Sequence, residues 1–238
     1  MINLQSSQIG ESLPLTATIN TALCVGAGGS SGSLADKPIL RNARGQLLIP
    51  ASQLKGRLRH ECEKLARGLG WPVCQSPNPA TMCPQRAGLT KAEEARFQRD
   101  EYRVEEDSRH HCLICQIFGN PSLPSQVDVN DLICHEATDT LPEVLRPGVT
   151  LNRRRLTAED QKLYFLETSP ANLNLEFQGS LYIHPHAPPY TKLLLSAALG
   201  HIHALGGGKS TGLGWLTWTT RPEISDANWQ ELLPGGVG

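Results

Sequence analysis

The chain has 238 residues, of which 39% are hydrophobic and 19% are charged. A chain of this length buries roughly 70% of the surface that its unfolded form exposes, which argues against disorder and against a need for covalent cross-links. Its 22 Lys and Arg against 23 Asp and Glu give a formal net charge of −1. This balance argues against a free-standing nucleic-acid binder with a uniformly basic surface.

The N-terminal residues MINLQSSQIGESLPL lack the basic start and apolar stretch of an export signal. No apolar run approaches the roughly 20 residues that span a bilayer. We therefore expect a cytoplasmic protein without a membrane partner. The seven cysteines are an odd number, so without an export signal a metal site or free thiols are favoured over a disulfide framework.

Residues 13–25 (LPLTATINTALCV) alternate apolar and polar side chains for most of their length, which predicts a half-buried strand. The next residues, GAGGSSGSLADKP (26–38), are rich in glycine, which allows positive φ angles and a close approach of the backbone to a ligand. Ser52 then offers an N-cap for an amphipathic helix over 53–68.

The periodic pattern fails between residues 71 and 124, where prolines accumulate and four cysteines appear in two pairs. We interpret this segment as an insertion that folds around something other than a hydrophobic core. After it, the patterns predict extended runs at 127–137 and 173–183, an apolar helix at 190–205 and a last strand at 215–218.

The predicted elements follow one another as strand, helix, strand, strand, helix and strand. This order is typical of a ferredoxin-like unit and predicts an α+β chain. We expect a single domain over residues 1–238, interrupted by the cysteine-rich insertion at 71–124.

The cysteines of the insertion are the strongest chemical signal. Cys112 and Cys115 form a CxxC pair, and Cys74 with Cys83 completes a possible tetrahedral S4 site. Thiolates in a closed four-coordinate site select Zn²⁺, which would be structural because no position is left for water. The alternative is four free thiols in a loop. The histidines that could replace a cysteine ligand are His60, His110 and His111, and the cysteines that we expect in the core are Cys24, Cys62 and Cys134.

The loop GGGKSTGLG (206–214) has five glycines in nine residues. Glycines in this number can turn several backbone N–H groups toward one concavity, and Lys209, Ser210 and Thr211 add groups suited to phosphate oxygens. The loop differs from a P-loop because it leads from a helix into a strand, whereas a P-loop leads from a strand into a helix. A plain connecting turn is the alternative.

The near-zero net charge conceals two opposite regions. Residues 37–67 contain eight basic and two acidic residues, whereas 93–107 contain seven acidic and three basic ones. Arg153, Arg154 and Arg155 form a further basic cluster in a turn-rich segment. A solvated helix face explains many such runs, but the first region also suits a groove that follows a nucleic-acid backbone.

Three motifs together resemble one known family. They are GAGGSSGSLADKPILRNARGQLLIPASQLKGRLRH (26–60), CLICQIFG (112–119) and ALGGGKSTGLGWL (204–216). The first resembles the opening of the RAMP proteins of type III CRISPR effector complexes, in which a strand, a Gly-rich loop, an Asp-x-Pro, a short hairpin and an IPxSxLKGxxR helix follow in order. The other two resemble the family's cysteine-bearing element and its late glycine-rich signature.

The resemblance implies a modified RNA-recognition fold with a thumb-like hairpin at about 148–175. It also implies a backbone subunit of the complex, with copies side by side along a CRISPR guide RNA and contacts to target RNA and other subunits. The residues that we assign to guide-RNA binding are Ser52, Gln53, Lys55, Arg57, Arg59, Arg153, Arg154, Gly207, Gly208, Lys209, Ser210 and Thr211.

Several such subunits cleave the paired target RNA through an aspartate, which falls on Asp36 here. A carboxylate beside the scissile phosphate can orient or deprotonate the ribose 2′-hydroxyl, or hold a divalent cation such as Mg²⁺. The alternative is that Asp36 only caps the turn before Pro38.

Three hypotheses follow for the function. The first is a guide-RNA-binding subunit that is also an endoribonuclease, and the second is a non-catalytic structural subunit of the same complex. The third is a stand-alone nuclease that processes CRISPR transcripts with a histidine as acid or base, for which His201 and His203 are the candidates. The IPxSxLKGxxR and CxxC motifs favour the backbone subunit.

Overall fold

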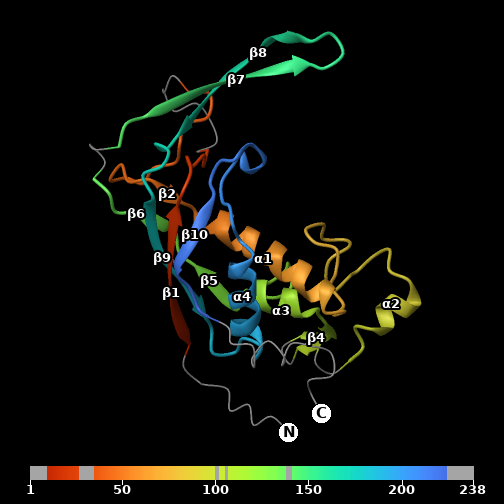
Figure 1. The fold of residues 1–238 in the computed structure, drawn as a ribbon. Coiled ribbons are helices and arrows are strands. Elements are labelled where there is room, and N and C mark those ends of the chain that lie inside the picture. Colours follow the sequence, from red (N-terminus) through yellow and green to blue (C-terminus); the bar gives the residue numbers. More distant parts are fainter. Residues whose placement is uncertain (1–9, 27–34, 100–101, 105–106, 138–140, 224–238) are drawn as a thin grey trace.

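The computed structural model describes residues 10–26, 35–99, 102–104, 107–137 and 141–223 (Figure 1). In chain order the elements are β1 (Glu11–Ile19), β2 (Leu48–Ile49), α1 (Ala51–Gly68), α2 (Lys91–Ala95), β3 (Arg103–Val104), β4 (Asp107–His110), α3 (Leu113–Phe118), β5 (Val127–Val129), β6 (Leu132–Cys134), β7 (Val144–Asn152), β8 (Thr157–Thr168), β9 (Leu175–Ile183), α4 (Thr191–Gly200), the 3-10 turn η3 (Lys209–Thr211) and β10 (Leu216–Thr220).

Six strands form one antiparallel sheet in the order β10-β1-β9-β6-β2, with β5 paired to the far end of β9. The central strands β1 and β9 pair along their whole lengths, from Glu11 opposite Ile183 to Ile19 opposite Leu175. Alternate side chains of β1 are buried, as its apolar alternation predicts. The chain is therefore a mixed α and β protein built on an antiparallel sheet.

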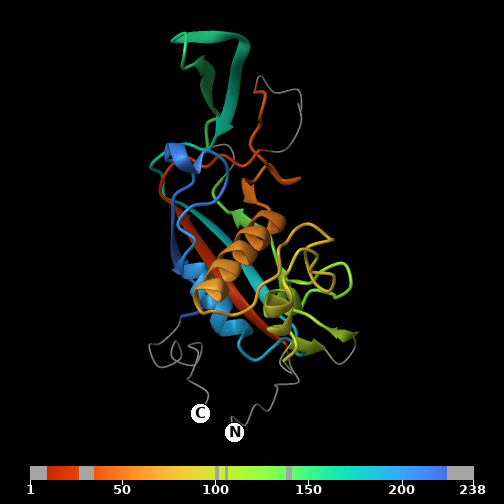
Figure 2. The ribbon, with the colours of Figure 1, turned by 90° about the vertical axis from the view of Figure 1, so that its right-hand side faces the viewer.

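Helices α1 and α4 lie side by side on one face of this sheet (Figures 1 and 2), and no described helix covers the other face (Figure 1). α1 presents its apolar residues at helical spacing to the sheet, whereas α4 is buried along most of its length. The fully buried side chains include Leu15, Leu54, Leu58, Leu132 and Phe177. Among the described residues, no helix is both long and apolar enough to cross a membrane.

The first strand is shorter than the predicted 13–25. β1 ends at Ile19, and residues 22–25 are buried without joining the sheet. Their backbone groups pair with other loops instead, since the Leu23 N–H donates to Ser169 Oγ and the Ala22 carbonyl accepts from Gly214. An apolar run thus continues beyond the strand because it packs under these loops.

The first helix starts earlier than predicted, and the prediction that Ser52 caps it is wrong. α1 begins at Ala51, with Pro50 at the N-cap position. The carboxylate of Asp131 accepts the Ala51 N–H at 2.7 Å, so the cap comes from a residue 80 positions away. Ser52 lies exposed within the first turn.

The later elements also differ from the predicted boundaries. The extended run at 127–137 divides into β5 and β6, with a break at Asn130 and Asp131. The helix predicted to end at 205 ends at Gly200, because Ala204 forms a bridge with Trp215 instead of continuing the helix.

The insertion at 71–124 contains α2, β3, β4 and α3 beside the end of α1 (Figure 1). Its cysteines are buried, as are several of its apolar side chains: Met82, Phe97, Ile114, Ile117 and Phe118. The expectation of a fold without a hydrophobic core is therefore wrong for this segment. The insertion adds apolar residues to the main core and has its own cysteine cluster.

Strands β7 and β8 form a separate two-stranded hairpin that projects from the body (Figure 1). Their pairing runs from Val144 opposite Thr168 to Asn152 opposite Thr157. The hairpin therefore covers 144–168, so it starts and ends earlier than the predicted 148–175. Residues 173–174 precede β9 of the main sheet.

Candidate functional site

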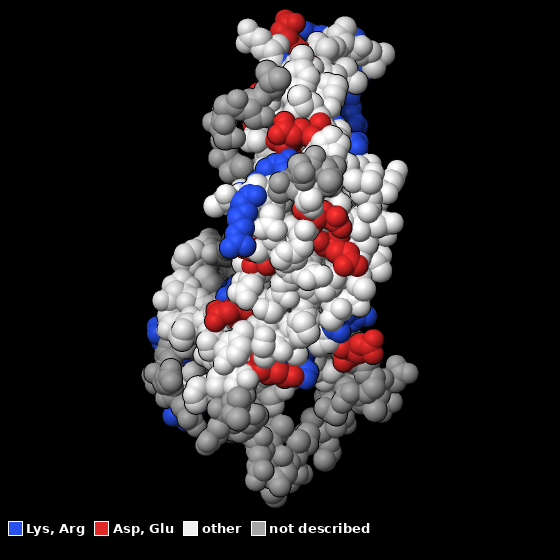
Figure 3. All heavy atoms as spheres, turned by 90° about the vertical axis from the view of Figure 1, so that its left-hand side faces the viewer, with Lys and Arg blue, Asp and Glu red and all other residues white. Residues whose placement is uncertain are grey.

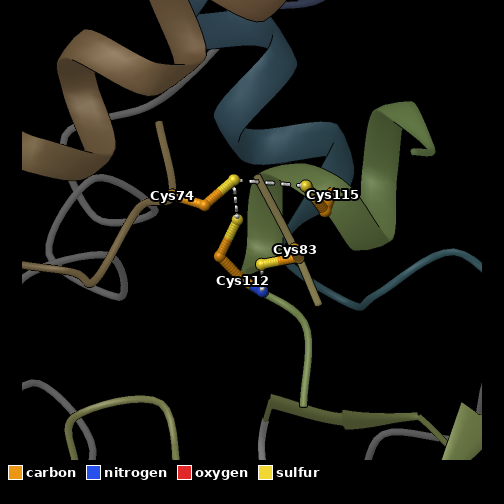
Figure 4. A group of neighbouring side chains, drawn as sticks. All are labelled: Cys74, Cys83, Cys112 and Cys115. Carbon is orange, nitrogen blue, oxygen red and sulfur yellow. Dashed lines mark hydrogen bonds between the residues drawn. The ribbon is translucent and has the colours of Figure 1, made fainter. Parts of the chain in front are cut away.

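Two regions contain the residues that the sequence singles out: the cysteine cluster of the insertion and the loops below the hairpin. In the cluster, the sulfur atoms of Cys74, Cys83, Cys112 and Cys115 lie within 4.8 Å of one another (Figure 4). The Sγ atoms of Cys74 and Cys115 are 3.5 Å apart, and those of Cys74 and Cys112 are 3.6 Å apart. A tetrahedral site with Zn–S bonds of about 2.3 Å has edges of about 3.8 Å. The spacing therefore fits a zinc ion.

Two arginines surround the sulfurs. Arg59 Nη2 donates to Cys115 Sγ at 3.6 Å, and Arg86 Nη1 donates to Cys83 Sγ at 3.5 Å. Four thiolates around one Zn²⁺ leave a charge of about −2, which two guanidinium groups would balance. Hydrogen bonds from Cys112 lower the pKa of the Cys83 and Cys115 thiols, which favours the thiolate form that metals bind.

The donor set consists of cysteines, so no histidine ligand is needed. His60 is exposed on α1, and His111 is buried with its Nδ1 2.9 Å from the Asn120 amide. The prediction that Cys24, Cys62 and Cys134 are core residues is confirmed, because all are buried outside the cluster. The four clustered cysteines are thus compatible with a closed, structural zinc site.

Asp36 lies exposed at the base of the hairpin. Its Oδ2 accepts the Phe165 N–H at 2.7 Å. The next residue, Lys37, pairs with β8, since its N–H donates to the Phe165 carbonyl and its carbonyl accepts the Glu167 N–H. Asp36 is therefore held against the hairpin by both its side chain and the backbone that follows it. Residues 27–34 of the glycine-rich segment lie outside the described residues.

A buried carboxylate fixes the chain after Asp36. Glu167 is only 4% exposed, and its Oε2 accepts the Ile39 N–H at 3.1 Å. Its Oε1 pairs with Arg41 at 3.4 Å. Removing this carboxylate would leave a buried donor and a cation without their partner, so Glu167 ties residues 36–41 to the hairpin.

The glycine loop, residues 206–214, is closed by backbone pairing at both ends. Gly207 N–H donates to the Cys24 carbonyl at 2.6 Å, and Gly214 N–H donates to the Ala22 carbonyl at 2.8 Å. Gly206, Gly208, Gly212 and Gly214 all have positive φ, which explains the glycine content. The predicted residues Gly207, Gly208, Lys209, Ser210 and Thr211 are exposed at its surface.

Residues 22–26 bring these loops together. Cys24 accepts from the glycine loop, Leu23 pairs with Ser169 at the end of the hairpin, and the Val25 carbonyl accepts the Leu40 N–H. The segment that follows Asp36, the glycine loop and the hairpin base therefore border one stretch of backbone. Figures 1 and 2 show the hairpin standing above the glycine loop.

The basic residues of α1 are engaged within the protein. Lys55 Nζ donates to Ser125 Oγ and to the Val127 carbonyl, both at 2.8 Å, and Arg59 donates to the Gly119 carbonyl at 2.9 Å. Arg57 pairs with Glu61 at 2.8 Å. The predicted basic groove along the helix is thus largely used by the fold itself.

The other predicted RNA-binding residues lie in two places. Gln53 is half-buried in the first turn of α1, and its Oε1 has no donor among the described residues. Arg153 and Arg154 are exposed at the turn of the hairpin, where Asn152 Oδ1 accepts the Arg154 N–H. They follow the strand that leads away from the base, so the structure does not bring them to Asp36.

The open face of the sheet has no Lys or Arg among its described residues. It presents Ser12, Pro14, Thr16 and Thr18 from β1, Glu176, Gln178, Ser180 and Tyr182 from β9, and Asp128, Ile133, Thr217 and Thr219 from the neighbouring strands. Figure 3 shows this side as mostly uncharged, with scattered acidic and basic groups. A surface of this kind lacks the cations that bind phosphates.

The sequence reasoning missed Arg146 of β7 and Glu167 of β8, which lie at the hairpin base. Glu167 binds Ile39 and Arg41, and Arg146 is the partner of Leu166, which pairs with Lys37 on its other side. The sequence of 144–149, VLRPGV, does not alternate apolar and polar side chains, so it carries no strand signal for this part of the hairpin.

Comparison with known proteins agrees with the three motifs. No curated protein matches the chain. The sequence profile of the RAMP superfamily matches residues 16–217, which include the second half of β1, helices α1 and α4, the insertion, the hairpin and the glycine loop. The chain therefore belongs to the RAMP superfamily.

Proposed function

We propose that this protein is a guide-RNA-binding backbone subunit of a type III CRISPR effector complex, and that it cleaves paired target RNA through Asp36. Membership of the RAMP superfamily indicates a CRISPR-associated, RNA-binding protein, and proteins of this superfamily can be endoribonucleases. The observation that carries the proposal is that the segment following Asp36, the glycine loop and the hairpin base all meet residues 22–26, while Asp36 itself is bound to the hairpin.

The sheet order supports a ferredoxin-like, modified RNA-recognition fold. Four neighbouring strands of the sheet are β10, β1, β9 and β6. If β1, β6, β9 and β10 are the four strands of the unit in chain order, the fourth lies beside the first, and the third lies between the first and the second. α1 and α4 are the two helices of this unit. The projecting hairpin is the element that we equate with the family's thumb.

The location of charge argues that RNA binds at the hairpin end of the molecule. The open sheet face has two carboxylates and no described cation, whereas Lys37, Arg41 and Arg146 are gathered where the hairpin meets the body. Phosphates contribute most of the affinity of a protein for RNA, so the cations decide where the strand lies.

Asp36 has the exposure and the anchoring that a catalytic carboxylate requires. One of its oxygens accepts from Phe165, and the carboxylate remains exposed to a bound strand. From this position it can deprotonate or orient the ribose 2′-hydroxyl, whose oxygen attacks the adjacent phosphate while the P–O5′ bond breaks, leaving a 2′,3′-cyclic phosphate and, once protonated, a 5′-hydroxyl on the next nucleotide. Holding a divalent cation such as Mg²⁺ beside the phosphate is the second way in which it can act.

The cysteine cluster has a structural part in this proposal. Zn²⁺ bound by Cys74, Cys83, Cys112 and Cys115 would join the two ends of the insertion and hold it against α1, which contributes Arg59 to the cluster. It would leave no open position for a substrate.

The test is Asp36→Asn in the assembled complex, with RNA complementary to the guide. Asparagine still accepts the Phe165 N–H but has no charge and no basic oxygen, so we expect cleavage opposite this subunit to disappear while guide retention stays unchanged. Asp128→Asn, an exposed aspartate of β5, is the control and should cut normally. Cleavage by both variants would contradict the catalytic part of the proposal. Comparing cleavage by the unchanged complex with and without a chelator tests whether a divalent cation is needed.

A non-catalytic structural subunit is the second candidate, and the Phe165 hydrogen bond favours it. That bond gives Asp36 a role in fixing the turn whether or not the residue cleaves RNA. Under this alternative Asp36→Asn retains cleavage, whereas Asp36→Ala loses assembly. The processing nuclease has less support, since His201 caps α4 and His203 is exposed beyond it.

A further inference from the structure

The base of the hairpin has two cations on one face. Leu166 of β8 has Arg146 as its antiparallel partner in β7 and Lys37 as its parallel partner on the other side. Residues opposite one another in neighbouring strands point to the same face of a sheet. Lys37 and Arg146 therefore flank Leu166, with their Cα atoms about 10 Å apart, or two strand spacings.

An aromatic ring extends this face toward the hairpin turn. Tyr164 is two residues before Leu166, so it lies on the same side, and its partner across the hairpin is Gly148. A Cβ on Gly148 would be 2.4 Å from the Tyr164 ring, which shows that the ring lies directly over the glycine. Tyr164 is still 38% exposed. Gly148 thus allows Tyr164 to lie across the neighbouring strand with one side open to solvent.

The two cations of this face lie near Cys24, which borders the glycine loop. Arg146 Nε donates to Thr168 Oγ1 at 3.2 Å, which leaves its other guanidinium N–H groups for a ligand. Burial raises the pKa of the Cys24 thiol, and the nearby charges of Lys37 and Arg146 lower it. The backbone carbonyl of Cys24 accepts the Gly207 N–H of the glycine loop. Two acids neighbour these residues in sequence. Glu167, next to Leu166, binds Ile39 and Arg41, and Asp36, next to Lys37, accepts the Phe165 N–H.

We propose that this face is a binding site for one nucleotide of single-stranded RNA, with a base stacked on Tyr164 and the flanking phosphates held by Arg146 and Lys37. Two cations beside an open aromatic ring are the combination that binds a single strand without reading its sequence. Contacts to phosphates carry no sequence information and stacking tolerates any base, so we expect binding that is independent of base identity. The inference rests on the proposed RNA-binding function and assigns residues that the motifs do not contain.

The experiment measures binding of the full-length chain to a fluorescein-labelled single-stranded RNA of mixed sequence, by anisotropy across a salt series. Lys37→Ala and Arg146→Ala should each reduce the slope of log K against log salt concentration by about 0.7, the value for one phosphate of a single strand. Arg146→Lys should keep the slope. Lys91→Ala, an exposed lysine of α2, is the control and should leave both affinity and slope unchanged.

Stacking is tested separately from charge. Tyr164→Ala should weaken binding about tenfold with no change of slope, whereas Tyr164→Phe should bind as the unchanged chain does. Gly148→Val tests the same geometry without altering the aromatic residue, because its side chain would displace the ring. Far-ultraviolet circular dichroism and the unfolding temperature show that each variant is folded.

The outcomes distinguish this site from the wider proposal. If the unchanged chain and the complex both fail to bind RNA, the proposed function is wrong and the site falls with it. If RNA binds but the slope is the same in Lys37→Ala, Arg146→Ala and Lys91→Ala, the phosphate sites are wrong while the proposed function stands. Equal affinity of Tyr164→Ala and Tyr164→Phe would overturn the stacking.

Discussion

Lys55 illustrates how a basic side chain can be engaged by the fold before any RNA binds. Its ammonium group donates to Ser125 Oγ and the Val127 carbonyl, and burial lowers its pKa. We expect Lys55→Ala to lower the free energy of unfolding by about 1–3 kcal/mol, because two acceptors lose a charged donor. Urea unfolding followed by circular dichroism measures the change.

Arg44 is the matched control for Lys55. Its side chain is exposed, and the hydrogen bond at this residue comes from its backbone N–H. Arg44→Ala should therefore change the unfolding free energy by less than about 0.5 kcal/mol. Equal stability of the two variants would mean that the contacts of Lys55 contribute nothing to the fold.

Cys112 tests the metal site at the scale of one sulfur. Cys112→Ser should release bound zinc, measured by mass spectrometry of the purified chain, and lower stability by about 3 kcal/mol or more, because metal binding and folding of the insertion are coupled. For a chain of this size that corresponds to a fall of about 6–12 °C in unfolding temperature. Cys134→Ser, a buried cysteine of β6, should keep its zinc. Equal zinc content in the two variants would contradict the site.

The sequence reveals more about the clustered cysteines than about the basic residues of α1. The cysteine cluster could be predicted because ligand chemistry limits the candidates, and CxxC spacing already fixes half of the site. The engagement of Lys55 and Arg59 could not, because their partners Ser125, Val127 and Gly119 come from 60 to 72 positions further along the chain. A positive charge on a helix is visible in a sequence, but its partner is not.

The glycine loop offers a test at the scale of one element. Gly212 and Gly214 both have positive φ, but a Cβ on Gly212 would meet nothing within 4 Å, whereas one on Gly214 would be 1.8 Å from the Leu205 carbonyl oxygen. Gly212→Ala should thus lower the free energy of unfolding only by the cost of placing a Cβ at a positive φ, about 1–2 kcal/mol. Gly214→Ala should cost clearly more, about 3 kcal/mol or above, because the loop closure must open. Thermal unfolding of the pair measures the difference, and equal losses would contradict this closure.

The contact between Glu167 and residues 36–41 predicts coupling of the hairpin to the Asp36 segment. Glu167→Ala removes the acceptor of the Ile39 N–H and the partner of Arg41. We expect faster amide hydrogen exchange in residues 37–41, since local opening no longer breaks these bonds. Glu176→Ala, on the open face of β9, is the control. Unchanged exchange in both variants would show that the backbone pairing alone holds the segment.

Element identity could be predicted from the sequence more fully than element ends. Periodicity located β1, α1, β9 and α4, since each has an apolar face that must be buried. Their ends depended on distant partners: Asp131 supplies the cap of α1, and Ala204 leaves the helix to pair with Trp215. The hairpin was placed several residues late because its exposed strands have no buried face to mark them.

At the scale of the whole molecule, the mixed α and β character could be predicted from the order of the elements, whereas the meeting point of the loops could not. Residues 22–25 are predicted as the end of a strand, yet with Gly26 they form the backbone on which the glycine loop, the segment after Asp36 and the hairpin converge. Pairing between segments more than 100 residues apart leaves no periodic pattern in either segment.

The distribution of charge over the molecule gives the last prediction. The net charge is −1, so RNA affinity depends on where the cations lie and not on the total. Ser210→Asp adds one negative charge to the exposed glycine loop, and Gln178→Glu adds the same charge to the open sheet face. Since screening limits such effects to about 10 Å at moderate salt, Ser210→Asp should weaken RNA binding severalfold and Gln178→Glu should not. Anisotropy with the same labelled RNA measures both, and a weaker complex for Gln178→Glu would move the RNA to the open face.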